Sequence, residues 1–306
     1  MRYYVLDRTL VVKGDFDGLS TGIDGGRRQV RAVLNHEVGM DFDNDDPAGY
    51  MEGIASRLGV EGPYFSLLTA VHMENLCVVR DQQVTVFVTA GISNPCHESL
   101  AGTINVIIVV HGGMSEGALM STVITATEAK SKTLFDMGFD FTGTTTDAIV
   151  VLMEGRDTRA CGPIRFEYSG TATDIGQSIY RCVKKGVAEG IKRQHPVTAN
   201  GDHKARVFVY AVAKNGPYWI EHPRENCGKG KCEYYPCHFE GQDCTHCYCP
   251  LYPCEDPLLG EWIKSGRGYP VWTCKDCILL HNTKTVDYLS KHPDASMGEL
   301  KNKLKD

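Results

Sequence analysis

The chain has 306 residues, of which 42% are hydrophobic and 23% charged, and its formal net charge is −6. This composition is typical of a globular protein with a buried core, and the length predicts about two domains. The acidic balance argues against a nucleic-acid partner, and no apolar stretch approaches the roughly 20 residues of a membrane helix. The first residues show no signal-peptide pattern, so we expect a cytoplasmic protein without a membrane partner.

The cysteines divide the chain into two parts. Four of the thirteen precede residue 183, and the other nine fall between Cys227 and Cys277. In a reducing compartment such a cluster predicts metal ligands rather than disulfides. We therefore expect a first domain over residues 1–215, a cysteine-rich zinc-binding domain over 222–285, and a helical tail over 286–306, of which residues 292–306 form a solvated end.

The N-terminal third predicts strands near residues 3–13, 29–38 and 65–71, with a helix over 47–58. A pair of glycines, Gly25-Gly26, separates the first two strands. Such a pair lets backbone approach a ligand, but it marks a tight turn far more often, and we favour the turn.

Two apolar runs, Val84–Val88 and Ile104–Val110, are rich in β-branched residues and predict strands buried on both faces. A third run, Ala148–Met153, follows the polar segment Thr142–Asp147. Asn105 interrupts the second run, and a buried amide must find hydrogen-bond partners. Loops at the ends of buried strands are where α/β scaffolds place their chemistry. We expect an α/β fold, a mixed sheet with packed helices, whose site lies among these loops.

Two long helices are predicted, Ser115–Gly138 and Asp174–Gln194, followed by a last strand over 206–212. At about 100° per residue, Lys130 falls in the middle of the apolar face of the first helix, whereas Glu128 points elsewhere. A lysine there either extends its amine to solvent at the rim or directs a cation into a pocket. The sequence leaves both interpretations open.

Several short motifs occur together and in the order of one known family. They are Gly25-Gly26, Thr69-Ala70-Val71, Thr89-Ala90-Gly91-Ile92-Ser93-Asn94, Gly102-Thr103-Ile104-Asn105, Thr125-Ala126-Thr127-Glu128-Ala129-Lys130, Thr142-Gly143-Thr144-Thr145-Thr146-Asp147 and Gly170-Thr171. On these motifs the chain resembles the adenosylcobinamide amidohydrolases, with Thr145 where the family usually has glycine. The resemblance implies hydrolysis of the amide between aminopropanol and the corrin ring, which gives adenosylcobyric acid for corrinoid salvage. The cysteine-rich block resembles a small domain sometimes attached to this family.

Amide hydrolysis requires an activated water or nucleophile, a stabilised oxyanion and a proton for the leaving amine. We expect Glu128 or Asp147 to act as the base, and Lys130 or backbone N–H groups near Gly91 and Gly143 to hold the oxyanion. A nucleophilic Thr89 ranks lower, because no histidine has obvious triad spacing to it. The motifs also suggest a set of substrate-binding residues: Gly25, Gly26, Gly91, Asn94, Thr103, Asn105, Thr144 and Thr146.

Two further interpretations accompany this hypothesis. The alternative function is a non-enzymatic sensor or carrier of corrinoids with a zinc-finger interaction module. His72, His97 and His111 lie in or near the motif loops, where they could bind a metal or the corrinoid cobalt. A lone loop histidine is more often only hydrogen-bonded.

The pairs Cys244-x-x-Cys247 and Cys274-x-x-Cys277 form a strong metal signature. We expect one or two structural Zn²⁺ ions, with an iron–sulfur cluster as the alternative. The histidines at 238, 246 and 281 are spare candidates. The expected ligands are Cys227, Cys232, Cys237, Cys244, Cys247, Cys249, Cys254, Cys274 and Cys277.

Aromatic and basic residues also occur together in this part of the chain. Trp262, Tyr269 and Trp272 with nearby lysines and an arginine are compatible with a nucleic-acid surface. We favour core aromatics for a domain this small, and any macromolecular partner of this domain is then more simply a protein.

Overall fold

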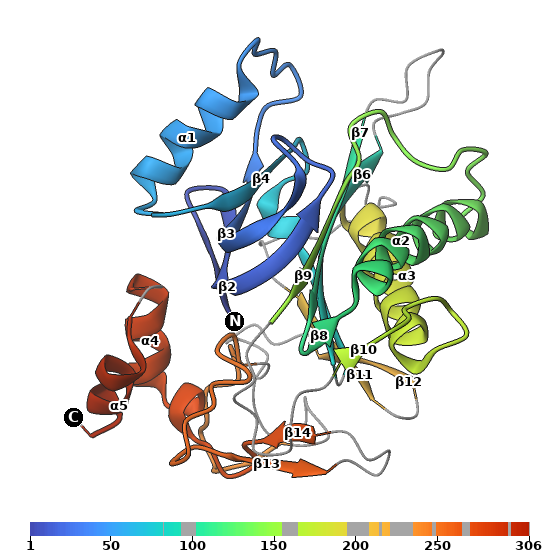
Figure 1. Cartoon of the computed structure of the whole chain (residues 1–306). Coiled ribbons are helices and arrows are strands. Elements are labelled where there is room, and N and C mark those ends of the chain that lie inside the picture. Colours follow the sequence, from blue (N-terminus) through green and yellow to red (C-terminus); the bar gives the residue numbers. More distant parts are fainter. Residues whose placement is uncertain are drawn as a thin grey trace, which may run out of the picture. The chain divides into compact units, whose positions relative to one another are not determined.

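The structure is a computed structural model that describes residues 1–81, 83–92, 102–154, 165–194, 208–213, 216–220, 235–246, 249–264, 270–292 and 295–305, with backbone only at 208–213, 216–220, 270 and 271. It separates into two compact units, Val5–Trp219 and Met1–Tyr4 with Ile220–Asp306. Figure 1 shows the sheet and two long helices of the first unit and the shorter elements of the second. Among the described residues, no helix is both long and apolar enough to cross a membrane.

A mixed sheet is the framework of the first unit. Its strands follow the order β12-β11-β5-β6-β7-β9-β2-β3-β4, and β1 (Arg2–Leu6) pairs with β2 outside this order. The pairs β7–β9, β3–β4 and β5–β11 are parallel, whereas β5–β6, β6–β7, β2–β9 and β2–β3 are antiparallel. The bounds are β2 Thr9–Ser20, β3 Gly26–Glu37, β4 Tyr64–Thr69, β5 Cys77–Asp81, β6 Val84–Ile92, β7 Gly102–Val110, β9 Ala148–Met153, β11 Phe208–Ala213 and β12 Gly216–Ile220.

The predicted α/β class is confirmed, and the predicted strands correspond to β1–β4, β6, β7, β9 and β11. Two strands of this sheet were missed. The stretch that forms β5 has only three apolar residues before Arg80, and β12 follows the strand that we expected to be the last. Two short strands, β8 (Gly113–Met114) and β10 (Arg165–Phe166), form a separate parallel pair.

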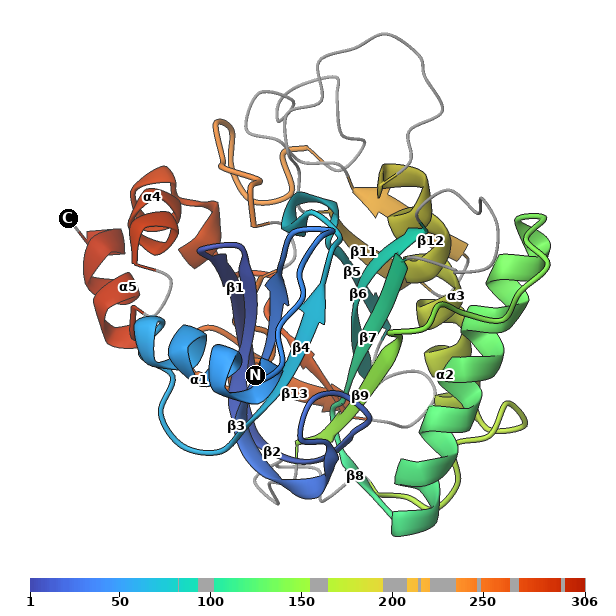
Figure 2. The ribbon, with the colours of Figure 1, turned by 90° about the horizontal axis from the view of Figure 1, so that it is seen from above.

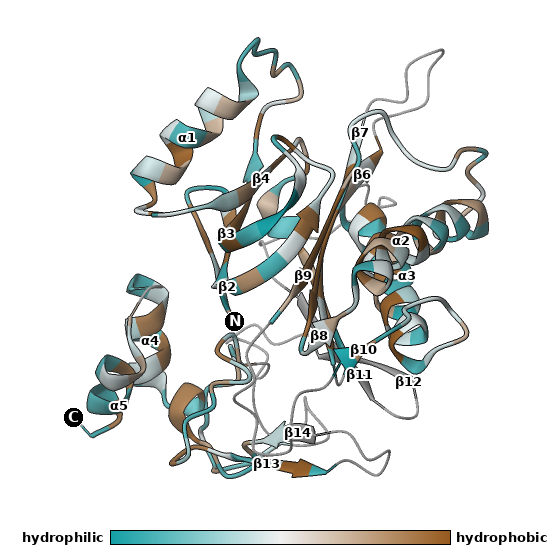
Figure 3. Ribbon diagram, in the orientation of Figure 1, coloured by the Kyte–Doolittle hydropathy of each residue, from teal (hydrophilic) through white to brown (hydrophobic). Residues whose placement is uncertain are grey.

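Two helices, α2 (Glu116–Asp136) and α3 (Asp174–Gln194), pack on one face of this sheet (Figure 2). Alternate residues of β6 and β7 point into this core, as the two-residue period of a strand requires. Two glycines let α3 approach the sheet closely. A Cβ on Gly186 would lie 2.6 Å from Val88 Cγ2, and one on Gly190 would lie 3.0 Å from the Cβ of Ala90. The apolar layer shows in brown in Figure 3.

The helices α1 and α2 each begin after a capping side chain. Asp46 accepts a hydrogen bond from the backbone N–H of Gly49 at the start of α1 (Pro47–Arg57). Ser115 accepts one from the N–H of Ala118 at the start of α2. Each cap satisfies one of the N–H groups that a helix leaves free at its first turn.

The second unit contains a hairpin of β13 (Glu261–Lys264) and β14 (Pro270–Thr273), the 3₁₀ helix η3 (Leu279–His281) and the helices α4 (Thr283–Lys291) and α5 (Met297–Lys305). Its apolar cluster joins both helices to the cysteine-rich residues. Leu289 and Leu300 pack there with Leu251 and Leu279, and three cysteines lie against them. The expectation of a solvated tail was therefore wrong, because this small unit uses the tail helices to complete its core.

Candidate active site

Asp147 ties the loop before β9 to the start of β7 and to α2. Its Oδ1 accepts hydrogen bonds from the backbone N–H of Ile104 at 2.9 Å and from the hydroxyl of Thr144 at 2.5 Å. Its Oδ2 accepts from the backbone N–H of Thr144 at 3.0 Å and from Lys130 Nζ at 2.5 Å. A carboxylate offers about four acceptor positions, so Asp147 is saturated in this arrangement.

Lys130 is a buried, paired cation. Its side chain and that of Asp147 are each only 10% exposed. A Cβ on Gly143 would lie 2.5 Å from Lys130 Nζ and 2.4 Å from Asp147 Oδ2, so the loop needs glycine directly above the pair. Neither of the two interpretations left open by the sequence describes this lysine fully. Its amine does not extend to solvent, and its charge is directed to a carboxylate of the neighbouring loop.

Threonine hydroxyls line the same edge. The hydroxyl of Thr146 donates to the carbonyl of Gly102 at 2.9 Å, and Thr103 Oγ1 lies 2.9 Å from Thr146 Oγ1. Thr144 Oγ1 lies 2.8 Å from the same carbonyl oxygen, which shares the single Thr144 hydroxyl hydrogen with Asp147 Oδ1. Gly102 has φ +150°, and a Cβ there would lie 2.5 Å from the carbonyl oxygen of Gly91. The motifs around residues 89, 102 and 142 therefore meet at one edge of the sheet, which we call the motif edge (Thr89–Gly91, Gly102–Asn105, Gly143–Asp147 and Lys130).

Behind the motif edge, three polar side chains form a buried network on the sheet face opposite the helices. The amide of Asn35 donates to Thr89 Oγ1 at 3.0 Å, and the amide of Asn105 donates to Asn35 Oδ1 at 3.0 Å and to the carbonyl of Leu68 at 2.8 Å. The sequence analysis missed Asn35. The signal was an amide at the end of the apolar run Val33-Leu34, the same signal that singled out Asn105.

The structure places Glu128 away from this edge. Glu128 is exposed and lines an open cavity on the outer side of α2 and α3. The glycine pair forms a tight turn after β2, as we favoured: the N–H of Gly25 donates to the carbonyl of Gly22 at 3.0 Å, and Gly26 has φ +97°. Asn94 lies outside the described residues.

The described loop histidines are hydrogen-bonded to carboxylates. His72 Nδ1 lies 3.1 Å from Glu37 Oε1. His111 lies 2.7 Å from Glu154 Oε2 and 2.9 Å from Thr85 Oγ1. This hydroxyl–imidazole–carboxylate order has the geometry of a catalytic triad. However, Thr85 is 0% exposed and lies at the end of β6 opposite the motif edge, so no substrate reaches its hydroxyl in this structure. His97 lies outside the described residues.

The Glu154–His111 pair predicts acid sensitivity. Burial alone would raise the pKa of the Glu154 carboxyl, but the attraction and hydrogen bond of His111 hold that pKa well below its ordinary value of 4.5. A group with a lowered folded-state pKa contributes stability above its unfolded pKa and loses it as the pH falls. We expect Glu154→Gln to be less stable than the wild type at pH 7, and the difference to narrow below pH 4.5. Urea unfolding of both proteins at pH 7 and at a pH below 4.5 measures this difference in stability. The control is Glu167→Gln, which alters an exposed carboxylate.

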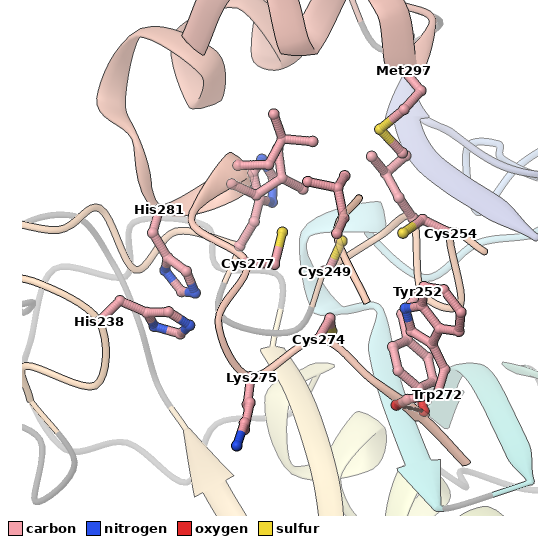
Figure 4. A pocket seen from close by; sticks show the side chains of 15 residues that line it. His238, Cys249, Tyr252, Cys254, Trp272, Cys274, Lys275, Cys277, His281 and Met297 are labelled. Carbon is pink, nitrogen blue, oxygen red and sulfur yellow. Dashed lines mark hydrogen bonds between the residues drawn. The ribbon is translucent and has the colours of Figure 1, made fainter. Parts of the chain in front are cut away.

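In the second unit, cysteines and histidines surround a small cavity (Figure 4). Cys249, Cys254, Cys274 and Cys277 line it together with His238 and His281, whose rings stack at 4.3 Å. The Nε2 atom of His238 is buried and has no hydrogen-bond partner among the described residues. Among the residues that the structure describes, no three Cys, His, Asp or Glu side chains converge closely enough to hold a metal ion.

A second group of sulfur atoms lies beside this cavity. The Gln242 amide donates to Cys237 Sγ at 3.0 Å and to Cys244 Sγ at 3.2 Å, so one amide group bridges the two sulfurs. No disulfide joins any of the described cysteines. The remaining expected ligands, Cys227, Cys232 and Cys247, lie outside the described residues.

Two of the aromatic residues considered in the sequence, Trp262 and Trp272, pack against each other within this unit. Trp272 is buried and meets Trp262 edge-on at 5.5 Å between ring centroids. Lys264 and Lys275 are exposed, whereas Tyr269 and Arg267 lie outside the described residues. The described aromatics therefore agree with the interpretation that they pack within the unit.

Comparison with known proteins covers both units. The family model for adenosylcobinamide amidohydrolase matches residues 8–199, and that for a cysteine-rich small domain matches residues 224–304. An adenosylcobinamide amidohydrolase of Methanosarcina mazei is 41% identical over 63% of this chain and 98% of its own length. One of Halobacterium salinarum is 31% identical over 55% of this chain and 77% of its own length. A probable cobalt-factor III C(17)-methyltransferase of Methanothermobacter thermautotrophicus is 46% identical over 26% of this chain and 19% of its own length. The chain belongs to the adenosylcobinamide amidohydrolase family.

Proposed function

We propose that this chain hydrolyses the amide between aminopropanol and the corrin ring of adenosylcobinamide, giving adenosylcobyric acid for corrinoid salvage. The observation that carries the proposal is the motif edge, where the motifs around residues 89, 102, 130 and 142 meet in one hydrogen-bonded group. Two relatives carry the name of this activity, and the family model of that name covers residues 8–199, which include all the motifs. The corrinoid is then the small-molecule substrate, and nothing favours a nucleic-acid partner.

The two candidate carboxylates differ in position, and this favours Asp147 over Glu128. Asp147 lies at the motif edge, but its four acceptor positions are taken. We therefore assign it a base role through the hydroxyl of Thr144, 2.5 Å from its Oδ1. The attacking water gives a proton to Thr144 Oγ1 while the Thr144 hydroxyl proton passes to Asp147. The resulting hydroxide attacks the amide carbon, and the same relay returns the proton to the leaving amine.

Hydrogen-bond donors at the motif edge would stabilise the oxyanion. Lys130 has three N–H donors, of which one is directed to Asp147, and backbone N–H groups near Gly91 and Gly143 lie in the same motifs. The cation also lies against the carboxylate that accepts the proton in this relay. A nucleophilic threonine is less favoured, since Thr89 accepts a hydrogen bond from an amide and has no imidazole or carboxylate partner among the described residues.

Turnover is the test. The full chain is incubated with adenosylcobinamide, and aminopropanol and adenosylcobyric acid are quantified. We expect equal amounts of the two products. Asp147→Asn and Thr144→Val should each lower kcat by about 100-fold, the lower end of general-base effects, while Glu128→Gln stays near the wild type. Tight corrinoid binding without turnover would favour the alternative function, a sensor or carrier of corrinoids. Full activity of Asp147→Asn would contradict the assignment of Asp147 as the base.

For the cysteine-rich unit we propose structural Zn²⁺. The support is chemical: thiols and a histidine with an unpartnered ring nitrogen line one cavity, and such a donor set suits zinc. Bound zinc would supply folding energy that this small apolar cluster lacks. Zinc binding by these cysteines would require reduced thiols, so we propose a reducing, cytoplasmic location. A protein partner of this unit stays a prediction.

A further inference from the structure

The side-chain amide of Gln242 joins two cysteines of the second unit. Gln242 is 4% exposed, and its Oε1 accepts hydrogen bonds from the backbone N–H groups of His238 at 2.9 Å and Phe239 at 3.2 Å. Backbone N–H groups only donate, so the oxygen must face them and the NH₂ group must face the other way. The amide nitrogen lies 3.0 Å from Cys237 Sγ and 3.2 Å from Cys244 Sγ. Gln242 therefore gives one hydrogen bond to each sulfur.

These two contacts indicate ionised sulfurs. Sulfur is a larger acceptor than oxygen, yet both distances lie within the range of about 2.7–3.2 Å of ordinary N–H···O bonds. Hydrogen bonds shorten when the acceptor carries a charge, and a neutral thiol is only a weak acceptor. Two neighbouring thiolates repel each other unless a cation binds them, and the thiolate is the form of cysteine that binds metals. Cys237 and Cys244 therefore have the character of two ligands of one metal ion.

His281 supplies a nitrogen donor next to this pair. The N–H of Asp243 donates to the carbonyl of His281 at 2.8 Å, and His281 Nδ1 lies 3.0 Å from the carbonyl oxygen of Asp243. A carbonyl only accepts, so Nδ1 carries the hydrogen, and Nε2 of the neutral ring keeps its lone pair. Metal-bound histidines are held in the same way, through a hydrogen bond of the ring nitrogen that does not bind the metal.

His238 contacts both parts of this group. Its ring stacks on that of His281 with 4.3 Å between centroids (Figure 4), and its Nδ1 lies 3.2 Å from Cys237 Sγ. A thiolate cannot donate, so Nδ1 carries the hydrogen here as well. The Nε2 atom is then a second lone pair, buried and without a hydrogen-bond partner among the described residues. Burying such an atom costs free energy, which a bound metal ion would offset.

We propose that Cys237, Cys244, His238 and His281 bind one Zn²⁺ ion, with Gln242 as the positioning residue for its thiolates. Two cysteines and two histidines are a common donor set of tetrahedral structural zinc sites. No three of these donors meet at bonding distance within the described part of the chain, so the ion would draw them closer together. One tetrahedral ion has only four positions, so we assign a second ion to the cavity cysteines, Cys249, Cys254, Cys274 and Cys277. This inference rests on the proposed structural zinc.

Zinc content tests the assignment in the full chain. The wild type should contain two Zn²⁺ ions per chain. Replacing Cys237 and Cys244 together by serine should leave one ion, and so should replacing Cys274 and Cys277. An unchanged zinc content of the Cys237→Ser, Cys244→Ser variant would overturn the proposal.

X-ray absorption at the zinc edge of the wild type does not depend on whether a variant folds. One ion with two cysteines and two histidines and one with four cysteines average three sulfurs at about 2.3 Å and one nitrogen at about 2.0–2.1 Å per zinc. Coordination by sulfur alone would exclude both histidines and overturn the proposal. A wild type without zinc would instead contradict the proposed structural zinc and remove the basis of this inference.

Gln242→Glu tests the positioning role. Glutamate keeps an oxygen for the two backbone N–H groups, but it replaces both N–H donors by an anionic oxygen that faces the thiolates. Losing such an outer partner typically costs about 10–100-fold in metal affinity. Competition with a chelator should therefore show that loss for one ion and none for the other. Gln177→Glu, the same charge change at an exposed position of the first unit, is the control. Wild-type affinity for both ions in Gln242→Glu would overturn the role of Gln242.

Discussion

Replacing Asp147 by alanine is expected to lower the free energy of unfolding of the first unit by about 3–5 kcal/mol, the usual cost of leaving a buried charge without its partner. The substitution removes the carboxylate from Lys130 and leaves the N–H groups of Ile104 and Thr144 without their acceptor. Urea unfolding of the full chain, followed by far-ultraviolet circular dichroism, measures the change.

Two variants define the control for Asp147. Asp136 is also paired with lysines, but it lies on the exposed surface, so Asp136→Ala should change stability little. Replacing Lys130 and Asp147 together by methionine and leucine removes the uncompensated charge and should restore part of the loss. If Asp147→Ala were as stable as Asp136→Ala, the ion pair would not hold the motif edge together.

Removing the proposed structural Zn²⁺ is expected to unfold the second unit, while the first unit keeps its sheet. Structural zinc contributes about 10–16 kcal/mol of folding free energy in small zinc-binding peptides. The apolar cluster around Leu279 and Leu300 is small by comparison. Treatment with a strong chelator should therefore abolish the near-ultraviolet signal of the packed pair Trp262–Trp272, with little change in the far-ultraviolet spectrum of the first unit.

Metal content gives this prediction its control. The purified chain should contain zinc, and Cys274→Ser with Cys277→Ser should lower the zinc content. Cys182→Ala, which alters a buried thiol of the first unit, should leave the zinc content unchanged. Iron together with labile sulfide in the purified chain would show an iron–sulfur cluster in place of zinc. A second unit that stays folded without any metal would contradict both the zinc and the cluster hypotheses.

Local patterns predicted much of the fold. The β-branched runs that became β6, β7 and β9 are buried along their whole length, with only Gly102 partly accessible, so composition and burial agree. Helical periodicity placed Lys130 on the buried face of α2 and Glu128 off it, and the structure agrees. β5 was missed because its few apolar residues end at an arginine, and pairing with β6 and β11 makes that stretch a strand.

The hydrogen-bond and ion-pair partners of the site residues could not be predicted from the sequence. Periodicity gave Lys130 a face but not the carboxylate that neutralises it, since Asp147 reaches it from another loop. In the same way, Asn35 meets Thr89 only because β3 and β6 face each other across the folded sheet. Motif order brought most of the candidate residues together, but the choice between Asp147 and Glu128 needed the three-dimensional arrangement.

The central claim is that this chain adds water across the corrinoid amide. The most direct measurement is turnover of adenosylcobinamide in ¹⁸O-labelled water, with mass analysis of the corrinoid product. The account predicts adenosylcobyric acid that carries one ¹⁸O atom in its new carboxylate, with one aminopropanol released for each. An intact corrinoid amide after incubation with the wild-type chain, or cleavage without incorporation of the label, would contradict it.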